Sequence, residues 1–197
     1  MNFPTIILLR HGQTQWNVEG RYQGQLNSDL TDLGKAQAKE NAFKICRILN
    51  IKEPFKFFSS PLGRARETAY IIANTLDIEK SEIIFDENIQ EVNYGVFEGK
   101  TKIFCKTEYK KEFEEREANK WEYILDGGES YEMVTKRIHV WLESIKDEKV
   151  VVLVAHEMIN RALRGIYCSY DKQVILNLRQ KNDIVLKLEN YKEFIVE

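Results

Sequence analysis

The sequence is poor in cysteine, proline and histidine, with three residues of each type among 197. Its cysteines, Cys46, Cys105 and Cys168, lie far apart and are odd in number, so neither a disulfide framework nor a zinc site is indicated. No segment approaches the ~20 apolar residues of a membrane span, and the first residues lack the basic region and long apolar run of a signal peptide. We therefore expect a reduced, cytoplasmic protein that does not enter a membrane.

The chain also carries little excess charge, with a formal net charge of −2 at pH 7. No global field steers it toward nucleic acid or an anionic membrane, and acidic residues interrupt its basic runs. Apolar and charged contents of 43% and 30% are those of an ordinary globular protein with a substantial core. We expect a single domain over residues 1–197 that acts on a small molecule as a monomer or a homodimer, and that binds neither nucleic acid nor membrane.

Apolar runs with strand character alternate with segments of helical periodicity along the chain. Strands are expected at 5–9, 55–60, 83–85 and 150–155, helices at 31–49, 64–76, 130–145 and 160–167, and a terminal hairpin at 184–196. This order predicts an α/β three-layer sandwich, in which a mainly parallel sheet carries helices on both faces. The charged, glycine-free segment at about 100–125 is predicted to be a helical insertion over the active-site edge of the sheet.

Basic and imidazole side chains define that edge, because they follow the ends of expected strands. Arg10 and His11 follow the first strand, Arg64 begins the helix after the second, and His156 follows the strand at 150–155. Ligands bind outside the carboxyl ends of strands in open α/β sheets, so we expect these side chains to share one pocket. Such a set suits a compact dianion, most simply a phosphoryl group, because the guanidinium fork matches phosphate oxygens.

A histidine in such a pocket can act as a nucleophile as well as a ligand. A neutral imidazole can attack phosphorus to form a covalent intermediate, while cationic neighbours stabilise charge on the equatorial oxygens. The leaving oxygen then needs an acid, for which Glu91 in ENIQEVNYGVFEG is the candidate, with Glu98 and Glu157 as rivals. The third histidine, His139, lies on an expected helix beside its apolar stripe, and we expect it to be structural or exposed.

Several segments of the chain together resemble a known family. They are RHGQTQWN, RYQGQLNSDLTDLGKAQA, SSPLGRARETA, EVNYGVFEG, GGES and VAHE, in that order. The first looks like the signature of the histidine phosphatase superfamily, which has the phosphoglycerate-mutase-like fold, and the set spans most of the chain. The resemblance is to the phosphatase branch, and it implies a hydrolase acting on phosphoric monoesters with no metal and no other cofactor.

The resemblance also implies roles by position. His11 would be the phosphorylated nucleophile and Glu91 the proton donor. The other positions would be Arg10, Arg64 and His156 in the phosphate pocket, Asn17 and Gln23 in hydrogen bonds to the phosphoryl group, and Thr14, Gly24, Tyr94 and Lys102 along the substrate site. For Lys102 an ordinary surface lysine is the simpler interpretation.

Phosphatases and mutases both occur in this family. The cofactor-dependent mutases resemble one another in a longer insertion with paired arginines and a proline-rich segment, whereas the segment 100–125 has only Arg116 and no proline. Val92 and Asn93 follow Glu91 where those mutases carry basic residues. Both departures favour water as the phosphoryl acceptor and a small phosphorylated metabolite as the substrate. A phosphoglycerate mutase, an α-ribazole phosphatase and a non-catalytic phospholigand-binding protein stay open as alternatives.

Two further features bear on the substrate. Many members of the family carry glycine after the second histidine, where this chain has Glu157. Its carboxylate is expected either to disfavour bisphosphates or to pair with a cationic or hydroxyl-bearing part of the substrate, unless it only pairs with Arg161 or Arg164. The aromatic residues of the insertion suggest an apolar or planar leaving group, and its place over the site suggests a lid.

Overall fold

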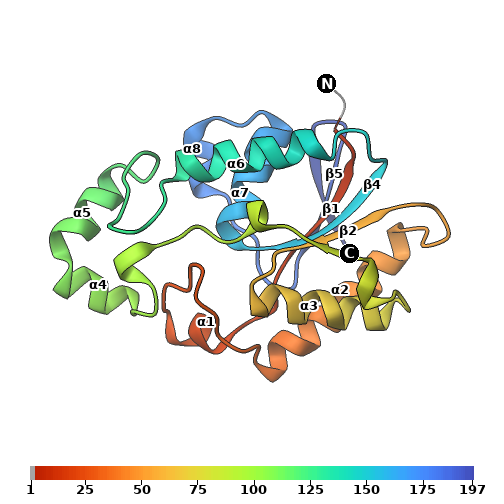
Figure 1. Ribbon diagram of the computed structural model, residues 1–197, viewed down its shortest axis with the longest axis horizontal. Helices are drawn as coiled ribbons and strands as arrows, with labels where there is room; N and C mark the ends of the chain where they lie inside the picture. Colours follow the sequence, from red (N-terminus) through yellow and green to blue (C-terminus); the bar gives the residue numbers. More distant parts are fainter. Residues whose placement is uncertain (1–2) are drawn as a thin grey trace.

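The computed structural model describes residues 3–197 and shows a six-stranded sheet between two layers of helices (Figure 1). The strands lie in the order β3-β2-β4-β1-β5-β6. Strands β1 to β4 run parallel, and β5 and β6 add an antiparallel hairpin at one edge. The predicted α/β sandwich with a mainly parallel sheet is therefore confirmed, and so is the hairpin. The strand bounds are β1 Thr5–Arg10, β2 Lys56–Ser59, β3 Ile83–Phe85, β4 Val150–Ala155, β5 Val185–Glu189 and β6 Lys192–Val196.

Helices cover both faces of the sheet, which explains the unbroken apolar run of β1. Ile6 and Leu8 pack into the core beneath the helices α6 and α7, while Ile7 and Leu9 face the core beneath α2 and α3. A strand covered on both faces buries every side chain, so its sequence shows no alternation. No helix within residues 3–197 is long and apolar enough to cross a membrane. The helices are α2 Asp32–Ile48, α3 Gly63–Thr75, α6 Tyr131–Ser144, α7 Glu157–Cys168 and the short α8 Lys172–Asn177.

Two long helices begin at the capping residues that the sequence indicates. The Thr31 hydroxyl accepts a hydrogen bond from the backbone N–H of Gly34 at 3.0 Å, which starts α2. The Ser130 hydroxyl accepts one from Met133 at 3.2 Å, which starts α6. Each cap satisfies a backbone donor that has no partner inside its helix, so the predicted starts at 31 and 130 are confirmed.

The start of α7 differs from the prediction. The helix expected at 160–167 begins at Glu157, directly after β4, with His156 as its N-cap residue. The prediction began three residues late because Glu157, the residue after His156, is polar, although the buried apolar stripe of the helix already starts at Ile159. The single-turn helix α1, Gln15–Glu19, and the short α8 were also not predicted, since segments of that length carry little periodic signal.

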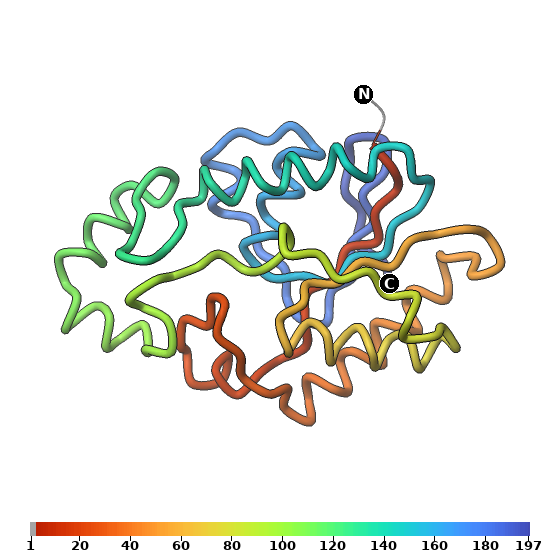
Figure 2. The backbone as a smooth tube through the Cα atoms, in the orientation of Figure 1, coloured from red at the N-terminus to blue at the C-terminus, as the bar shows by residue number. Residues whose placement is uncertain are grey.

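The predicted insertion forms two helices, α4 (Lys102–Glu108) and α5 (Lys110–Ala118), beyond the carboxyl ends of the parallel strands (Figure 2). Its aromatic side chains form a small core of their own. The rings of Tyr109 and Phe113 lie 5.9 and 6.4 Å from that of Phe97, which is 0% exposed. Of the aromatic residues in 100–125 only Phe113 lines the cavity described below, so the insertion as a whole gives little support to an apolar leaving group.

Backbone hydrogen bonds join the two stems of the insertion, the segments 93–98 and 125–129. The N–H of Val96 donates to the carbonyl of Asp126 at 3.1 Å, and that of Glu129 donates to Asn93 at 2.8 Å. Gly95 has a φ of +50°, and a Cβ at this position would collide with the Asp126 carbonyl oxygen. Glycine therefore permits the close approach of the stems, which closes the insertion at its base.

Candidate active site

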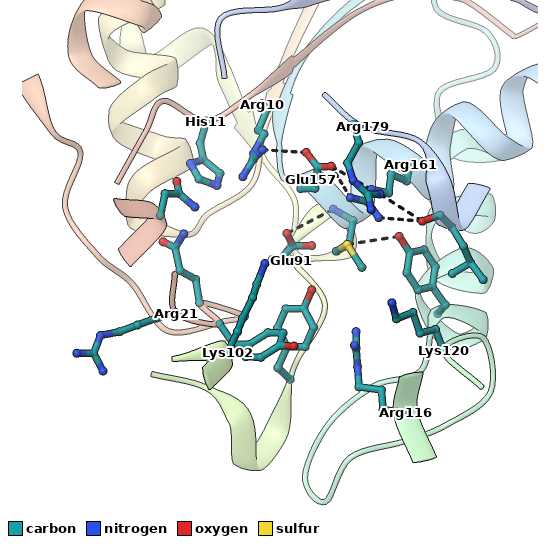
Figure 3. A pocket seen from close by; sticks show the side chains of 18 of the residues that line it. Arg10, His11, Arg21, Glu91, Lys102, Arg116, Lys120, Glu157, Arg161 and Arg179 are labelled. Atoms are coloured by element: carbon teal, nitrogen blue, oxygen red, sulfur yellow. Dashed lines mark hydrogen bonds and ion pairs between the residues drawn. The ribbon is translucent and has the colours of Figure 1, made fainter. Parts of the chain in front are cut away.

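A cavity of about 340 Å³ opens at the carboxyl ends of β1, β2 and β4 (Figure 3). Its volume suits a small metabolite. The structure places most of the predicted site residues on its lining, whereas Thr14 and His156 lie behind the wall, each 0% exposed. The predicted residues that line the cavity are Arg10, His11, Asn17, Gln23, Gly24, Arg64, Glu91, Tyr94 and Lys102.

The imidazole of His11 is held in one orientation and one tautomer. Its Nδ1 lies 2.8 Å from the carbonyl oxygen of Gly12, which can only accept, so Nδ1 carries the proton and Nε2 keeps its lone pair. Burial lowers the pKa of His11 well below its usual value, and the nearby charges of Arg64 and Arg10 lower it further. The side chain is thus a neutral imidazole with a nucleophilic nitrogen beside two guanidinium groups.

The glycine after His11 has a steric reason. A Cβ on Gly12 would collide with the backbone carbonyl of Gly34, at the start of α2. The N–H of Gly12 also donates to the Thr68 hydroxyl of α3 at 3.0 Å. The segment that carries His11 is therefore fixed against both α2 and α3, and this packing requires glycine at position 12.

His156 packs against His11, with ring centroids 5.2 Å apart. Its Nε2 lies 2.7 Å from the hydroxyl oxygen of Ser60, while its buried Nδ1 has no hydrogen-bond partner within residues 3–197. Burial lowers the pKa of His156 well below its usual value, and the charge of Arg64 adds to this effect. A neutral ring with one unpaired nitrogen can take up a hydrogen bond when a ligand enters.

Two arginines flank His11, each held by acceptors from the surrounding chain. Arg64 donates to the backbone carbonyls of Leu26 and Gly24, both at 2.7 Å. Burial lowers the pKa of Arg64 to about 10, so this guanidinium is still charged at neutral pH. The buried Nε atoms of Arg10 and Arg64 have no protein acceptor within residues 3–197. The strand-end side of the cavity, formed by Arg10, His11 and Arg64, therefore presents unpaired donors that suit an anion.

Glu157, the carboxylate that follows His156, bridges two arginines of the protein. Its Oε2 accepts from Arg10 at 2.9 Å, and its Oε1 accepts from Arg161 at 2.6 Å. The predicted pairing with Arg161 is confirmed, while Arg164 pairs with Glu193 instead. Both oxygens of Glu157 are thus occupied, which removes the acidic rival for proton transfer and leaves the carboxylate to hold Arg10 in place.

Glu91 is a buried carboxyl group on the wall of the cavity. The side chain is 7% exposed, and its oxygens accept from the N–H of Val92 at 3.0 Å and of Met158 at 3.4 Å. Burial raises the pKa of Glu91, although the charge of Arg64 opposes that shift. The other rival, Glu98, accepts from the backbone N–H of Gln25 and does not line the cavity. Of Glu91, Glu98 and Glu157, Glu91 is therefore the one that lines the cavity without an ion pair to another residue within 3–197.

A short hydrogen-bonded chain holds the polar residues beside His11. Thr14 caps α1 and shares a capping box with Asn17. The Thr14 hydroxyl also donates to Oε1 of Gln23 at 3.0 Å. Since Oε1 of Gln23 is engaged on that side, its amide nitrogen is directed away from Thr14. The buried Thr14 thus positions Asn17 and Gln23, and it does not face the cavity itself.

Several residues of the lining were not expected from the sequence. Most of them carry a positive charge or an aromatic ring on a segment without a strand-end motif. Arg116 was noted as the arginine of the insertion, but nothing in its sequence neighbourhood indicates that its side chain turns inward. His139 is exposed on α6, as expected. The unexpected lining residues include Arg21, Tyr22, Phe113, Arg116, Lys120, Tyr131, Met158 and Arg179.

Comparison with known proteins finds relatives that match most of the chain. The chain is 31% identical to phosphoserine phosphatase 1 of Hydrogenobacter thermophilus, over 98% of this chain and 96% of that protein. It is 39% identical to the probable phosphoglycerate mutase GpmB of Escherichia coli, over 72% of this chain and 63% of that protein. It therefore spans less than two thirds of the mutase-like relative.

A solved structure of a phosphatase also has this fold. A mycobacterial glucosyl-3-phosphoglycerate phosphatase, solved as a complex with VO3, superposes with a TM-score of 0.81 at 25% identity and covers 98% of this chain and 96% of that chain. A family model of the histidine phosphatase superfamily (branch 1) matches residues 6–194. With nearly the whole chain matched, and with the motifs of its strand ends gathered around one cavity, the protein belongs to the histidine phosphatase superfamily.

Proposed function

We propose that this protein hydrolyses a phosphoric monoester of a small metabolite through a phosphohistidine on His11, without a metal or another cofactor. The observation that carries the proposal is the state of His11. Its Nδ1 is bonded to the Gly12 carbonyl, its pKa is lowered by burial, and Arg10 and Arg64 lie on either side. The neutral nucleophile therefore lies beside guanidinium groups that can bind the phosphoryl oxygens.

The first step transfers the phosphoryl group to the enzyme. The Nε2 lone pair of His11 forms a bond to phosphorus, and the bond between phosphorus and the ester oxygen breaks. The carboxyl group of Glu91 gives its proton to that oxygen, so the alcohol leaves neutral. Arg10, Arg64 and the Nδ1 of His156 stabilise the charge on the equatorial oxygens, with Asn17 and Gln23 contributing further hydrogen bonds.

The second step returns the enzyme to its starting state. A water molecule attacks phosphorus and gives a proton to the carboxylate of Glu91, and the bond between phosphorus and Nε2 breaks. Inorganic phosphate leaves, and His11 is again neutral while Glu91 is again protonated. Each group therefore ends in the protonation state that burial favours, since burial lowers the pKa of His11 and raises that of Glu91.

The named activities of the relatives support a phosphatase. Phosphoserine phosphatase 1 matches nearly all of both chains, and the Arabidopsis relative, a probable 2-carboxy-D-arabinitol-1-phosphatase, is 33% identical over 90% of this chain and 36% of that protein. Phosphoglycerate mutase is the second candidate, because the GpmB relative is 39% identical over its shorter match. An α-ribazole phosphatase is a narrower version of the first proposal.

The test compares the wild type with His11→Ala on a panel of phosphomonoesters, with a metal chelator present throughout. We expect phosphate release by the wild type and its loss in the variant. Acid-labile incorporation of phosphate, absent in His11→Ala, would support the covalent intermediate directly. Conversion of 3-phosphoglycerate to 2-phosphoglycerate with a bisphosphate primer, without phosphate release, would replace the proposal by the mutase. Activity that survives in His11→Ala would overturn the role of His11.

A further inference from the structure

The GGES segment at 127–130 has no role in the proposed reaction, yet its glutamate is engaged inside the protein. Ser130 of this segment caps α6, and Glu129 precedes it. The Glu129 carboxylate accepts two hydrogen bonds from Arg137 of α6, from Nε at 3.0 Å and from Nη2 at 3.1 Å. The two side chains are only 16% and 18% exposed. A two-pronged pair of this kind fixes both side chains in one geometry.

This pair holds the chain on either side of Glu91. Oε2 of Glu129 accepts from the backbone N–H of Asn93 at 2.9 Å, and the backbone N–H of Glu129 donates to the Asn93 carbonyl at 2.8 Å. Arg137 donates to the backbone carbonyls of Asn88 and Glu91, the second at 3.4 Å. The pair is therefore bonded to backbone groups at 88, 91 and 93, and Glu91 lies in the middle of that stretch.

The stretch has no regular structure of its own to orient it. Residues 91–94 belong to no helix or strand, so their backbone groups depend on side chains and neighbouring loops. Ile89 and Val92 pack into the core beneath α6 and fix how deep the stretch lies. Apolar packing has no preferred direction, whereas hydrogen bonds do. The direction in which the Glu91 side chain leaves the backbone is therefore set mainly by the polar pair.

We propose that Glu129 and Arg137 are positioning residues that aim the Glu91 carboxyl group at the ester oxygen of the substrate. This inference rests on the proposed function, in which Glu91 gives a proton to that oxygen. Proton transfer requires hydrogen-bond reach, and a displacement of about 1 Å can cost about 10²-fold in rate. Because the two charges of the pair offset each other, Arg137 can bind the backbone beside Glu91 without favouring loss of its proton.

The test measures how the rate depends on the leaving group in Arg137→Met and in Glu129→Gln. A displaced acid should lower kcat for alkyl phosphates, whose alkoxide needs a proton, by roughly 10- to 100-fold. For p-nitrophenyl phosphate, whose leaving group departs without a proton, kcat should fall by less than about threefold. Inhibition by vanadate should be unchanged, because the strand-end side of the cavity is not altered. Arg137→Lys keeps the charge without the fork and should be intermediate.

A matched control removes a different charge from the same helix. Lys136 is exposed on α6, and its Nζ lies 3.4 Å from the exposed carboxylate of Glu132. Lys136→Met should therefore keep wild-type kinetics on both esters. Equal losses on both esters in Arg137→Met would overturn the inference, because a general loss of structure does not distinguish leaving groups. Wild-type kinetics in Arg137→Met would overturn it as well.

Hydrogen exchange follows the stretch directly, without catalysis. Amide exchange at residues 91–94 should speed up in Arg137→Met and stay unchanged in Lys136→Met. Unchanged exchange in Arg137→Met would overturn the inference even if its kinetics differ from those of the wild type.

Glu91→Gln separates this inference from the proposed function. A loss confined to alkyl phosphates in Glu91→Gln, without such a loss in Arg137→Met, would overturn the inference and leave the proposed function intact. Equal losses on both esters in Glu91→Gln would instead contradict the acid role within the proposed function, and the inference would fail with it. Hydrolysis of p-nitrophenyl phosphate that depends on His11 supports the nucleophile in either case.

Discussion

On the strand-end side of the cavity, His11 and Arg64 are 2% and 1% exposed, and backbone carbonyls accept their hydrogen bonds. On the insertion side, Arg116 packs against two tyrosine rings and donates a 3.4 Å hydrogen bond to Glu117. The first set of groups is fixed by the sheet and by the helices packed beneath it. The second is carried by a small aromatic core outside the sheet. The two sides of the cavity are therefore held by different parts of the fold, and the variants below probe that difference.

Replacing the proposed acid should give the largest effect. Glu91→Gln is expected to lower kcat by about 10²- to 10⁴-fold for alkyl phosphates, because the leaving alkoxide loses its proton donor. The loss should be much smaller for p-nitrophenyl phosphate, whose leaving group departs without a proton. Steady-state kinetics on both esters measures this difference. Glu98→Gln is the control and should show no dependence on the leaving group, and equal losses on both esters in Glu91→Gln would contradict the acid role.

Removing the centre of the aromatic core should loosen the insertion and spare the sheet. Phe97→Ala is expected to lower the stability of the insertion by about 3–5 kcal/mol, because the side chain is fully buried. Hydrogen exchange should then speed up in α4 and α5 far more than in β1. The control is Phe57→Ala in the core of the sheet, which should speed up exchange in β1. If both variants affect β1 equally, the insertion is not a separate part.

Glu157→Gln tests how firmly the strand-end side is held. The amide keeps the shape of the side chain but loses the charge that binds Arg10 at 2.9 Å, so we expect kcat/KM to fall by roughly 10- to 100-fold. Inhibition by vanadate, which occupies the phosphoryl position, should weaken in parallel. Glu193→Gln breaks the pair with Arg164 on the same helix α7 and should leave vanadate inhibition unchanged. A normal vanadate constant in Glu157→Gln would show that Arg10 needs no such support.

The pH dependence of stability should reveal the buried histidines. Burial lowers the pKa of His11 and His156 below their usual value of 6.5. As the pH falls, these two histidines therefore bind protons in the unfolded chain before they do so in the folded chain. Stability should therefore fall as the pH drops below 6.5, by about 1.4 kcal/mol per pH unit for each such group. Urea unfolding between pH 5 and 7 measures the slope. His156→Asn should reduce it, whereas replacement of the exposed His139 should not.

The strand-end side could be predicted from the sequence, and the insertion side could not. Arg10, His11 and Arg64 follow apolar strands, and parallel strands bring their carboxyl ends together whatever the details of packing. Arg116 lies in a segment rich in both charges, where an inward turn depends on contacts with Tyr22 and Tyr94, about 94 and 22 residues away along the chain respectively. The periodicity of the local sequence carries no information about such distant contacts, so the position of the Arg116 side chain could be found only from the structure.

The first turn of α7 was missed for a related reason. Glu157 and Arg161 are polar, yet they lie half-buried or buried because they serve Arg10 and the cavity wall. The inner face of α7 is apolar, with Ile159, Ala162 and Leu163 in the core, but the helix begins at Glu157, whose ion pairs with Arg10 and Arg161 leave no apolar pattern in the sequence. The error therefore fell in a turn that lines the cavity, where polar side chains pair with one another inside the protein.

Because its stems at 93–98 and 125–129 are paired, the insertion can be replaced as one unit. Both of its ends leave and re-enter the fold at one place, where Val96 donates to Asp126, Glu129 donates to Asn93, and Gly95 allows the two backbone segments to touch. A segment closed in this way can be lengthened, shortened or grafted without moving the sheet. Directed evolution of new selectivity in this chain therefore has a defined target between the stems, and the residues that would perform the chemistry need not be altered.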